Sequence, residues 1–496
     1  MSGLELGAAL RSRLLEAAPV LLTEISSSEL SSLTDGQLLR GILESARDST
    51  RRAAWLAYVA IAGAFPVPTQ LDDFESALRL ASDSTLVKDA VTSIDIGDRR
   101  HRRPDREITV VQNVVIADVN FCATHAHNTG IQRVVRSVMP VWRGASHPHL
   151  LVAWTDDDAG YRELTEVERA RVVAWTHDAP RVTPQPPEPG RIIVPWGATL
   201  FLPEVPQYAQ CGPIVAMAEA GVVDVDLIGY DVIPITSADS VAAGESERFA
   251  IYLDVVKHAR SVLAISDTVA AEFEGFVAAL PTQGLTGPVV HSVPLAVDVP
   301  AGARDAAAAA RGTADIPIMV CVGSHEPRKN QEAVLFAAER MHREGHELGV
   351  VFVGGGNRVA YADFDRRVRR LRRAGMRVES HRRLDDDGLW RLYGRARFTV
   401  FISLHEGFGL PAAESLAVGT PVLVSDSGSL AEIATLGGCL TVDPRDDEAI
   451  ADGMRRMLED DELIARLQDE AMSAPTRSWS QYAERLWQLV GKPSAA

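Results

Sequence analysis

Residues 398–432, FTVFISLHEGFGLPAAESLAVGTPVLVSDSGSLAE, decide the fold of this 496-residue chain. Residues 398–403 are apolar and rich in β-formers, a turn with Gly407 and Gly409 follows, and Pro411 opens an alanine-rich segment. This order predicts a strand, a tight loop and the start of a helix. Backbone N–H groups just ahead of a helix favour an anion, because the helix dipole adds to their charge. The predicted donors of this phosphate site are the amides of Phe408, Gly409 and Leu410.

Two carboxylates frame the loop. Glu406 precedes it, and Glu414 follows with seven residues between them. Glu406 can accept hydrogen bonds from sugar hydroxyls, and Glu414, facing the same cleft, can hold a ribose diol. Neither carboxylate needs to transfer a proton. Since the chain has 67 acidic residues, such a spacing also arises by chance, and a solvated face is the alternative.

Composition limits the classes of protein that fit. A chain of 496 residues is too long for one core and predicts two large domains plus a smaller part. Hydrophobic content of 46% and charged content of 24% are typical of a globular protein. The net charge of −17 argues against general nucleic-acid binding. Four scattered cysteines without a C-x-x-C pair indicate neither a zinc site nor a disulfide framework.

The amino terminus does not have the pattern of a secretion signal. Glu5 stands where a signal peptide needs positive charge, and Arg11 and Arg13 interrupt the only apolar core. No apolar run approaches the roughly 18 residues that cross a bilayer. We therefore expect a cytoplasmic protein, with any contact to the inner face of the membrane being peripheral.

Residues 1–97 are expected to form an α-helical extension. Thr34 and Gln37 are typical of a capping box, and the prolines of residues 65–68 end a second helix. The extension has no catalytic constellation, so packing, oligomerisation or binding of a partner protein is its expected role. Residues 98–106, DRRHRRPDR, predict a solvated basic linker, with contact to an anionic membrane or a charged acceptor as the alternative.

A nucleotide-fold unit is predicted after the linker. The β-rich run 108–120 leads into a polar loop with His125, His127 and Gly130, and a helix follows. Strand, glycine loop and helix place this loop at the carboxyl edge of a parallel sheet, where ligands bind. The two histidines suggest a metal site as an alternative, but no third ligand is apparent.

A second nucleotide-fold unit begins with the buried strand 316–324, which ends in Gly323 and Ser324. Arg328 and Lys329 follow directly, where two cations can neutralise a diphosphate, and a surface ion pair is the alternative. The candidates for donor binding in this unit, besides the glycine loop, are Gly323, Ser324 and His381.

Three further patterns have ordinary structural explanations. Gly354-Gly355-Gly356 lacks the full dinucleotide fingerprint and indicates close approach of the backbone near the ligand rather than an NAD site. The acidic triplets 156–158 and 385–387 suggest metal binding, but each stands where a turn or a helix start favours Asp. The arginines of 366–373 predict a solvated helix face. No metal is expected.

Several motifs together resemble one family. EGFGLPAAE, GTPVLVSD and SLAE resemble the donor-binding signature of the retaining glycosyltransferases of family four, which have the two-domain GT-B fold. GSHEPRKN (323–330) is similar to the family's basic motif, in which arginine and lysine hold the donor pyrophosphate. TGIQRV (129–134) resembles its amino-domain glycine loop. LIGYDVIPI (227–235) and VLAISDTVAAEF (262–273) resemble two further segments of that domain.

The resemblance covers residues 108–490 and implies an α/β protein with two Rossmann-like domains facing a cleft. The expected division is an amino-terminal acceptor domain at 107–302, a donor domain at 303–474, and a helix at 475–496 that crosses back to the acceptor domain. The two domains and the final helix come after the helical extension and the basic linker in the chain.

The resemblance also implies roles for single residues. Arg328 and Lys329 would stabilise the leaving diphosphate, and Glu406 would orient the sugar. On the acceptor side, Gly130 would permit close approach, Arg133 would meet an anion, and Asp231 is a weaker candidate. Many relatives have a histidine where this chain has Tyr230, so a sugar-contacting histidine is not transferred to this position. Tyr230 would offer its hydroxyl or pack in the core.

The expected activity is metal-independent transfer of a hexose with retained configuration. The sugar, which is mannose, glucose or a deoxyhexose, would pass from a nucleotide diphospho-sugar to a hydroxyl of a glycan or glycolipid, by family analogy in bacterial polysaccharide or glycoconjugate assembly. No cofactor besides the nucleotide-sugar donor is expected. The alternatives are a nucleotide-sugar-binding or assembly protein without turnover, and a sugar-nucleotide epimerase or phosphorylase. The sequence names neither the sugar, the base nor the acceptor.

Overall fold

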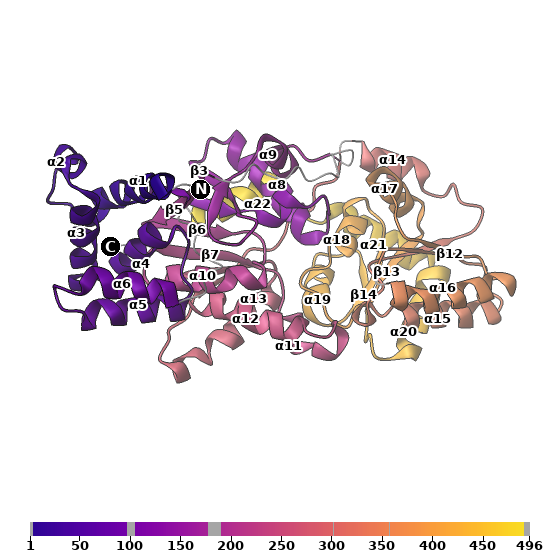
Figure 1. The fold of residues 1–496 in the computed structure, drawn as a ribbon. Helices are drawn as coiled ribbons and strands as arrows, with labels where there is room; N and C mark the ends of the chain where they lie inside the picture. The colour runs from indigo at the N-terminus through magenta and orange to yellow at the C-terminus, as the bar shows by residue number, and fades with distance from the viewer. Residues whose placement is uncertain (1–2, 97–104, 177–189, 301, 357, 491–496) are drawn as a thin grey trace.

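The computed structural model describes residues 3–96, 105–176, 190–300, 302–356 and 358–490. Figure 1 shows an elongated molecule in which a helical segment, a first sheet and a second sheet follow one another from left to right. The predicted basic linker 98–106 lies outside the described residues except for Asp105 and Arg106. Arg106 is buried, and its guanidinium makes two 3.0 Å hydrogen bonds to Asp157. This end of the segment is therefore not solvated.

The amino-terminal segment is helical, as predicted. Its helices are α1 (Gly3–Leu21), α2 (Ser27–Ser32), α3 (Asp35–Asp48), α4 (Arg51–Ala62), α5 (Pro68–Leu80) and α6 (Leu86–Ile96). The capping box of Thr34 and Gln37 is confirmed. Helix α4 is buried on all sides, and the segment shares one hydrophobic core with the first sheet. Buried Arg13 strengthens this junction by donating to the carbonyls of Ala60, Ile61 and Arg106.

The first sheet has the order β1-β5-β4-β3-β2-β6-β7-β8-β9, and only β4 runs antiparallel to its neighbours. Its strands are β1 (Glu107–Gln112), β2 (Val115–Asp118), β3 (His149–Trp154), β4 (Tyr161–Glu163), β5 (Arg191–Trp196), β6 (Ala198–Leu202), β7 (Val223–Gly229), β8 (Ser261–Ala264) and β9 (Val289–Ser292). The predicted β-run 108–120 is split at Asn113, whose φ of 54° is left-handed. As a result β1 pairs with β5, whereas β2 pairs with β3 and β6.

Helices cover this sheet and, with it, make up what we call the amino-terminal domain. They are α7 (Asn120–Thr124), α8 (Gly130–Gly144), α9 (Glu166–Val173), α10 (Tyr208–Glu219), α11 (Ile233–Thr236), α12 (Glu245–Lys257) and α13 (Asp267–Val277), with 3-10 turns η2 (Ala238–Ser240) and η3 (Leu280–Gln283). The last helix of the chain, α22 (Trp479–Val490), packs on α8, where Trp142 Nε1 donates a 2.8 Å hydrogen bond to the carbonyl of Ala483.

The second sheet is parallel throughout, with the order β12-β11-β10-β13-β14-β15. Its strands are β10 (Ile318–Val322), β11 (Gly349–Val353), β12 (Val378–His381), β13 (Phe398–Phe401), β14 (Val422–Ser425) and β15 (Cys439–Val442). Because all strands run in one direction, the loops after β10 and β13 leave the sheet at the same edge, side by side.

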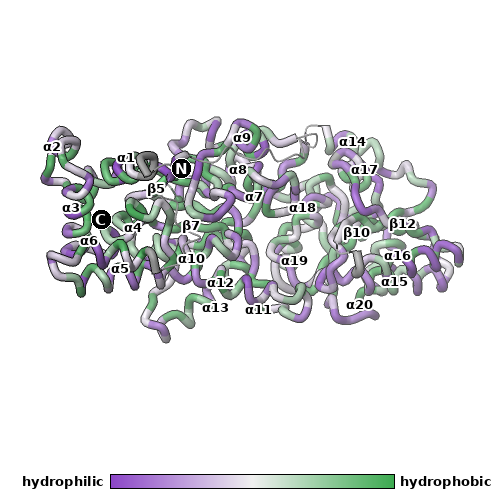
Figure 2. The backbone as a smooth tube through the Cα atoms, in the orientation of Figure 1, coloured by the Kyte–Doolittle hydropathy of each residue, from purple (hydrophilic) through white to green (hydrophobic). Residues whose placement is uncertain are grey.

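We call this sheet and its helices the carboxy-terminal domain. The helices are α14 (Ala303–Ala310), α15 (Gln331–Arg343), α16 (Arg358–Arg373), α17 (Asp386–Arg395), α18 (Leu410–Ala417), α19 (Gly428–Ala434), α20 (Asp447–Glu459) and α21 (Asp461–Ser473), with the 3-10 turn η4 (Pro327–Lys329). Figure 2 shows α15 and α16 banded in purple and green, as expected for helices that bury one face. None of the described helices is both long and apolar enough to cross a membrane.

Candidate functional site

The two predicted cations lie on one buried carboxylate. Lys329 Nζ forms an ion pair with Glu406 Oε1, and Arg328 Nη1 lies 3.2 Å from Glu406 Oε2. Glu406 is only 9% exposed. Burial by itself would raise the pKa of Glu406, but Lys329 and Arg328 outweigh that effect and the pKa is lowered. Glu406 is therefore ionised. Arg328 also pairs with Glu326 at 2.9 Å, so two carboxylates balance the two cations in this structure.

The loop that bears these cations is fixed to the loop after β13. The carbonyl of Arg328 accepts a 2.7 Å hydrogen bond from the amide of Leu404, and Arg328 Nη1 donates to the carbonyl of His405 at 3.1 Å. Gly354 lies so close to β10 that an added Cβ would be 1.8 Å from the carbonyl oxygen of Gly323. The triple glycine thus approaches the backbone of Gly323 closely, while its place near the ligand stays a prediction.

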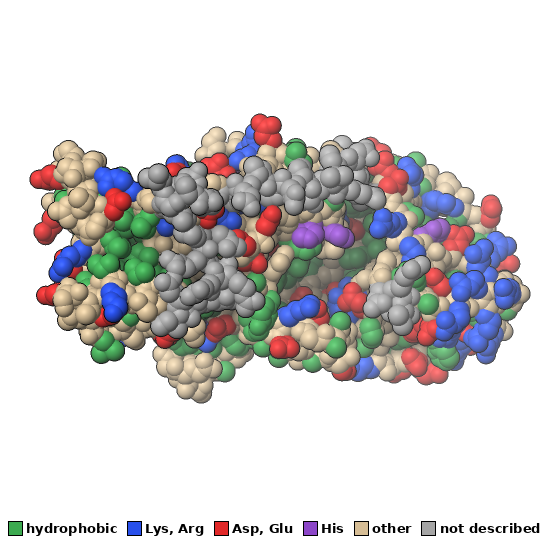
Figure 3. Space-filling view, in the orientation of Figure 1, with side chains coloured by type: hydrophobic (Ala, Val, Ile, Leu, Met, Phe, Trp, Pro, Cys, Tyr) green, Lys and Arg blue, Asp and Glu red, His purple; other side chains and the backbone are tan. Residues whose placement is uncertain are grey.

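The predicted phosphate loop precedes α18 and touches the amino-terminal domain. Gly409 caps the helix at a left-handed φ of 103°, which glycine adopts without strain. A Cβ on Gly407 would be 2.1 Å from the carbonyl oxygen of Tyr230, and Ser266 Oγ donates a 2.7 Å hydrogen bond to the carbonyl of Gly407. The amides of residues 408–410 therefore stand at the helix start, in the junction of the two domains. Figure 3 shows a hollow there, in the middle of the molecule.

Two predicted acceptor-side residues contact α18 and the predicted phosphate loop before it, residues 407–410, which we call the donor loop. Arg133 of α8 forms an ion pair with Glu414, and Tyr393 donates a 3.1 Å hydrogen bond to the same carboxylate, which is 2% exposed. A Cβ on Gly130 would be 3.9 Å from Leu410 Cδ1. The structure thus brings Gly130 and Arg133 to the start of α18. A ribose held by Glu414 would have to share the carboxylate with Arg133.

Tyr230 and Asp231 have different surroundings. The hydroxyl of Tyr230 donates a 2.7 Å hydrogen bond to the carbonyl of Pro203 inside the core, so its side chain packs, and its backbone carbonyl faces the donor loop. Burial raises the pKa of Asp231, while the nearby Arg328 opposes that shift. Asp231, the weaker candidate, therefore lies close to the cation cluster.

The remaining donor candidates are divided between two places. Gly323 and Ser324 lead from β10 into the cation loop, and the carbonyl of Gly323 accepts a 2.8 Å hydrogen bond from Gln331. His381 instead lies 2.9 Å from Glu379 and lines a cavity of about 430 Å³ together with Arg391 of α17. The structure therefore does not bring the His381 side chain to the cation cluster.

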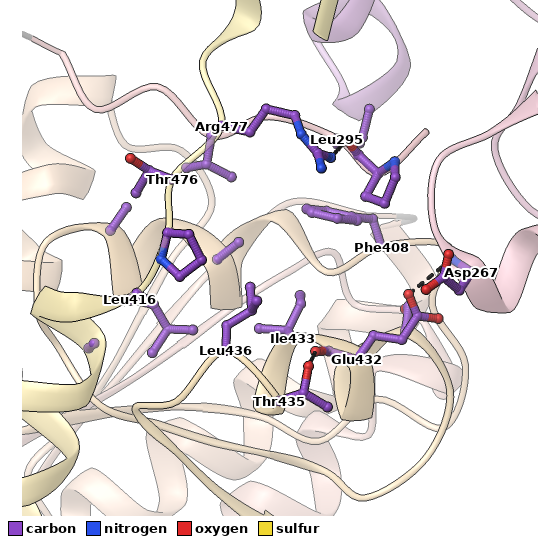
Figure 4. A pocket seen from close by; sticks show the side chains of 18 of the residues that line it. Asp267, Leu295, Phe408, Leu416, Glu432, Ile433, Thr435, Leu436, Thr476 and Arg477 are labelled. Atoms are coloured by element: carbon purple, nitrogen blue, oxygen red, sulfur yellow. Dashed lines mark hydrogen bonds between the residues drawn. The ribbon is translucent and has the colours of Figure 1, made fainter. Parts of the chain in front are cut away.

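Sequence reasoning assigned no role to two residues that join the domains. Glu432, the last residue of the SLAE motif, accepts hydrogen bonds from the amides of Asp267 at 3.0 Å and Thr268 at 2.5 Å, and so caps α13 of the other domain (Figure 4). His405 lies between Glu272 at 2.6 Å and Ser237 at 2.9 Å. Glu432 ends a family motif and His405 directly precedes one, but their partners lie more than 130 residues away.

The His405 contact predicts a pH dependence. The hydrogen bond with Glu272 raises the pKa of His405, although burial opposes the shift. A raised pKa adds stability below the unfolded pKa of about 6.5, and this stability is lost as the pH rises through the folded pKa. The melting temperature of the wild type should therefore exceed that of His405→Gln most at pH 5.5 to 6, with the difference shrinking towards pH 9. A difference that is constant with pH would contradict the ion pair.

A cavity of about 650 Å³ lies behind the donor loop, with walls from both domains (Figure 4). It is lined mainly by apolar side chains, among them Leu295, Phe408, Leu416 and Ile433, while Arg477 lies at its upper side in the figure. Its mainly apolar walls do not suit a diphosphate.

The acidic triplets have structural roles. Asp385 caps α17 by accepting a hydrogen bond from the amide of Gly388 at 2.7 Å, as its position predicted. Asp157 pairs with Arg106. Over the described ranges, no group of three or more His, Cys, Asp or Glu side chains is placed to hold a metal ion.

Two nucleotide-type sheets whose loops meet at a shared junction define the GT-B fold, and solved structures agree. Sucrose-phosphate synthase from Thermosynechococcus elongatus is 17% identical with a TM-score of 0.51, over 76% of this chain and 96% of that one. Anabaena Alr3699/HepE in complex with UDP and glucose is 11% identical with a TM-score of 0.53, and the match covers 76% of this chain and 99% of that chain. At such identities the likeness establishes the fold alone.

The family match lies in the carboxy-terminal domain. Residues 307–473 match the family model of the glycosyl transferases group 1, so this part of the chain is a glycosyl transferases group 1 domain. The serotype-specific mannosyltransferase WbdA of Escherichia coli is 28% identical over 335 residues, 64% of this chain and 40% of that protein. The O-antigen chain mannosyltransferase B of Escherichia coli is 33% identical over 146 residues, which are 28% of this chain and 36% of that protein. The matches thus span at most about 40% of these relatives.

Proposed function

We propose that this chain is a glycosyltransferase that moves a hexosyl group from a nucleotide diphospho-sugar to an acceptor hydroxyl, with retention and without a metal ion. The observation that carries the proposal is the pair of cations, Lys329 and Arg328, held by Glu406 beside the glycine loop at a domain junction. Relatives named as mannosyltransferases make mannose the first sugar to test, and an O-antigen enzyme among them favours polysaccharide assembly.

The residues suggest how the leaving group would be stabilised. As the bond between the anomeric carbon and the diphosphate breaks, negative charge grows on the phosphate oxygens. Lys329, Arg328 and the amides of residues 408–410 would receive that charge. A new bond to the acceptor oxygen forms on the same face, and the acceptor proton passes to the departing phosphate. Glu406 would keep both cations in position and accept hydrogen bonds from the sugar.

A thermal-shift screen with UDP, GDP, dTDP and ADP tests the donor site. Selective stabilisation by one of them is expected, because a ligand that binds only the folded state raises its melting temperature. The matching nucleotide sugars, mannose first, are then supplied with and without glycan acceptors. Release of nucleoside diphosphate only with acceptor supports transfer, whereas binding without release supports a binding protein. Absence of a shift with all four nucleotides would contradict the proposal.

A further inference from the structure

A cluster of aromatic rings follows strand β2 in the amino-terminal domain. The rings of Phe121 and His125 are stacked, with centroids 4.2 Å apart and planes 11° from parallel. The ring of His127 lies 6.3 Å from that of His125. All three come from α7 and the loop after it, at the carboxyl end of β2, which is the edge where α/β sheets bind ligands.

Two buried arginines hold this loop from behind. Arg136 donates to the carbonyls of Cys122 at 3.3 Å and His125 at 3.0 Å, and also to that of His127. Arg171 donates to the carbonyl of Ala123 at 3.1 Å. The side chains of Phe121 and His125 are half-buried, and that of His127 is exposed. Such support fixes a binding surface before the ligand arrives.

The loop also leads directly to the donor side. It runs into α8, whose first residue, Gly130, approaches Leu410, and whose Arg133 pairs with Glu414 of the carboxy-terminal domain. The ring cluster is thus joined through one short loop to the start of α18.

The chemistry of the rings points to a carbohydrate. Burial lowers the pKa of His125, so its ring is neutral at physiological pH and presents an uncharged flat face. A pyranose has one face of C–H groups that is apolar, while its hydroxyls point outward to polar partners. Aromatic side chains combine an apolar face with a polar edge, which suits such a ligand.

We propose that the stacked rings of Phe121 and His125 bind the C–H face of the acceptor sugar and set its position against the donor. The inference rests on the proposed function and assigns its acceptor subsite. The protein contains a matched stack elsewhere, since His147 lies on Trp487 with centroids 4.4 Å apart and planes 11° from parallel. His147, in the segment between α8 and β3, also pairs with Glu484 of α22, so it serves as the control.

The test uses labelled full-length protein on an array of immobilised bacterial and mannose-containing glycans. The wild type is expected to bind at least one glycan, and His125→Ala to weaken that binding at least tenfold. His125→Phe, which keeps a flat ring, should retain it within about threefold, and His147→Ala should leave it unchanged. Melting temperatures of all variants, with and without the preferred nucleoside diphosphate, are measured in parallel to show that each one folds.

Three results would overturn the proposed acceptor subsite. They are a wild type that binds no glycan, full binding by His125→Ala, and loss of binding in His125→Phe as well as in His125→Ala. In the last case a ring nitrogen, and not a ring face, would be the contact. If the nucleoside diphosphate still raises the melting temperature while glycan binding gives one of these three results, only the acceptor subsite is rejected. Absence of that shift in the wild type would reject the proposed function together with it.

Discussion

Replacing Lys329 by methionine is expected to lower turnover about 100-fold. The ammonium group is lost from the place where charge grows on the leaving diphosphate, and removal of one preorganised donor raises the barrier by about 3 kcal/mol. Methionine keeps the length of the side chain, so packing changes little. Glu406 remains paired with Arg328 at 3.2 Å, which limits the loss of unfolding free energy to about 1 to 3 kcal/mol. Steady-state kinetics and urea unfolding measure the two effects.

A double variant separates catalysis from folding. Lys329→Met combined with Glu406→Gln removes the charge that the single change leaves underpaired, so much of the unfolding free energy should return. Turnover should stay low, because neither group can then stabilise the diphosphate or hold the sugar. Recovery of turnover together with stability would mean that Lys329 acts only through folding.

Local patterns predicted the donor loop well. Strand β13 ends at Phe401 and α18 begins at Leu410, as the order of apolar run, glycines and proline indicated. The capping boxes and the cap at Asp385 were equally local, because each depends on residues three positions apart. The family motifs predicted that Arg328 and Lys329 bind the diphosphate and that Glu406 orients the sugar. The contact of both cations with Glu406 was not predicted, and the structure brings these three residues together.

Long-range partners could not be predicted in this way. Arg133 and Glu414 are 281 residues apart, and no periodicity reports that their side chains meet. The helical spacing of apolar Leu38, Ile42 and Ala46 predicts a buried face, but it does not say that the amino-terminal helices share a core with the first sheet. The same holds for His405, whose place before the EGFGLPAAE motif gives no hint of its contact with Glu272. Such contacts depend on how whole domains pack.

Gly407→Ala is the second change with a large expected effect. Its φ lies outside the left-handed region, so alanine can adopt the backbone conformation, and the effect is steric. The new methyl group would lie 2.1 Å from the carbonyl oxygen of Tyr230 and 3.3 Å from Ile265 Cδ1. Backbone cannot move aside as a flexible side chain can, so the donor loop and the amino-terminal domain must separate. Misplacement by about 1 Å lowers rates about 100-fold, and we expect a loss of this size in kcat/KM.

Gly275→Ala is the matched control for this change. Gly275 lies in α13, the helix capped by Glu432, and a Cβ there meets nothing within 4 Å. Alanine in a helix interior is slightly stabilising relative to glycine, so this variant should keep wild-type kcat/KM and stability. In contrast, Gly407→Ala should lose about 1 to 3 kcal/mol of unfolding free energy, as overpacked sites do. Wild-type kcat/KM in Gly407→Ala would mean that contact between this loop and Tyr230 is not needed for transfer, and that the domains work while further apart than in this structure.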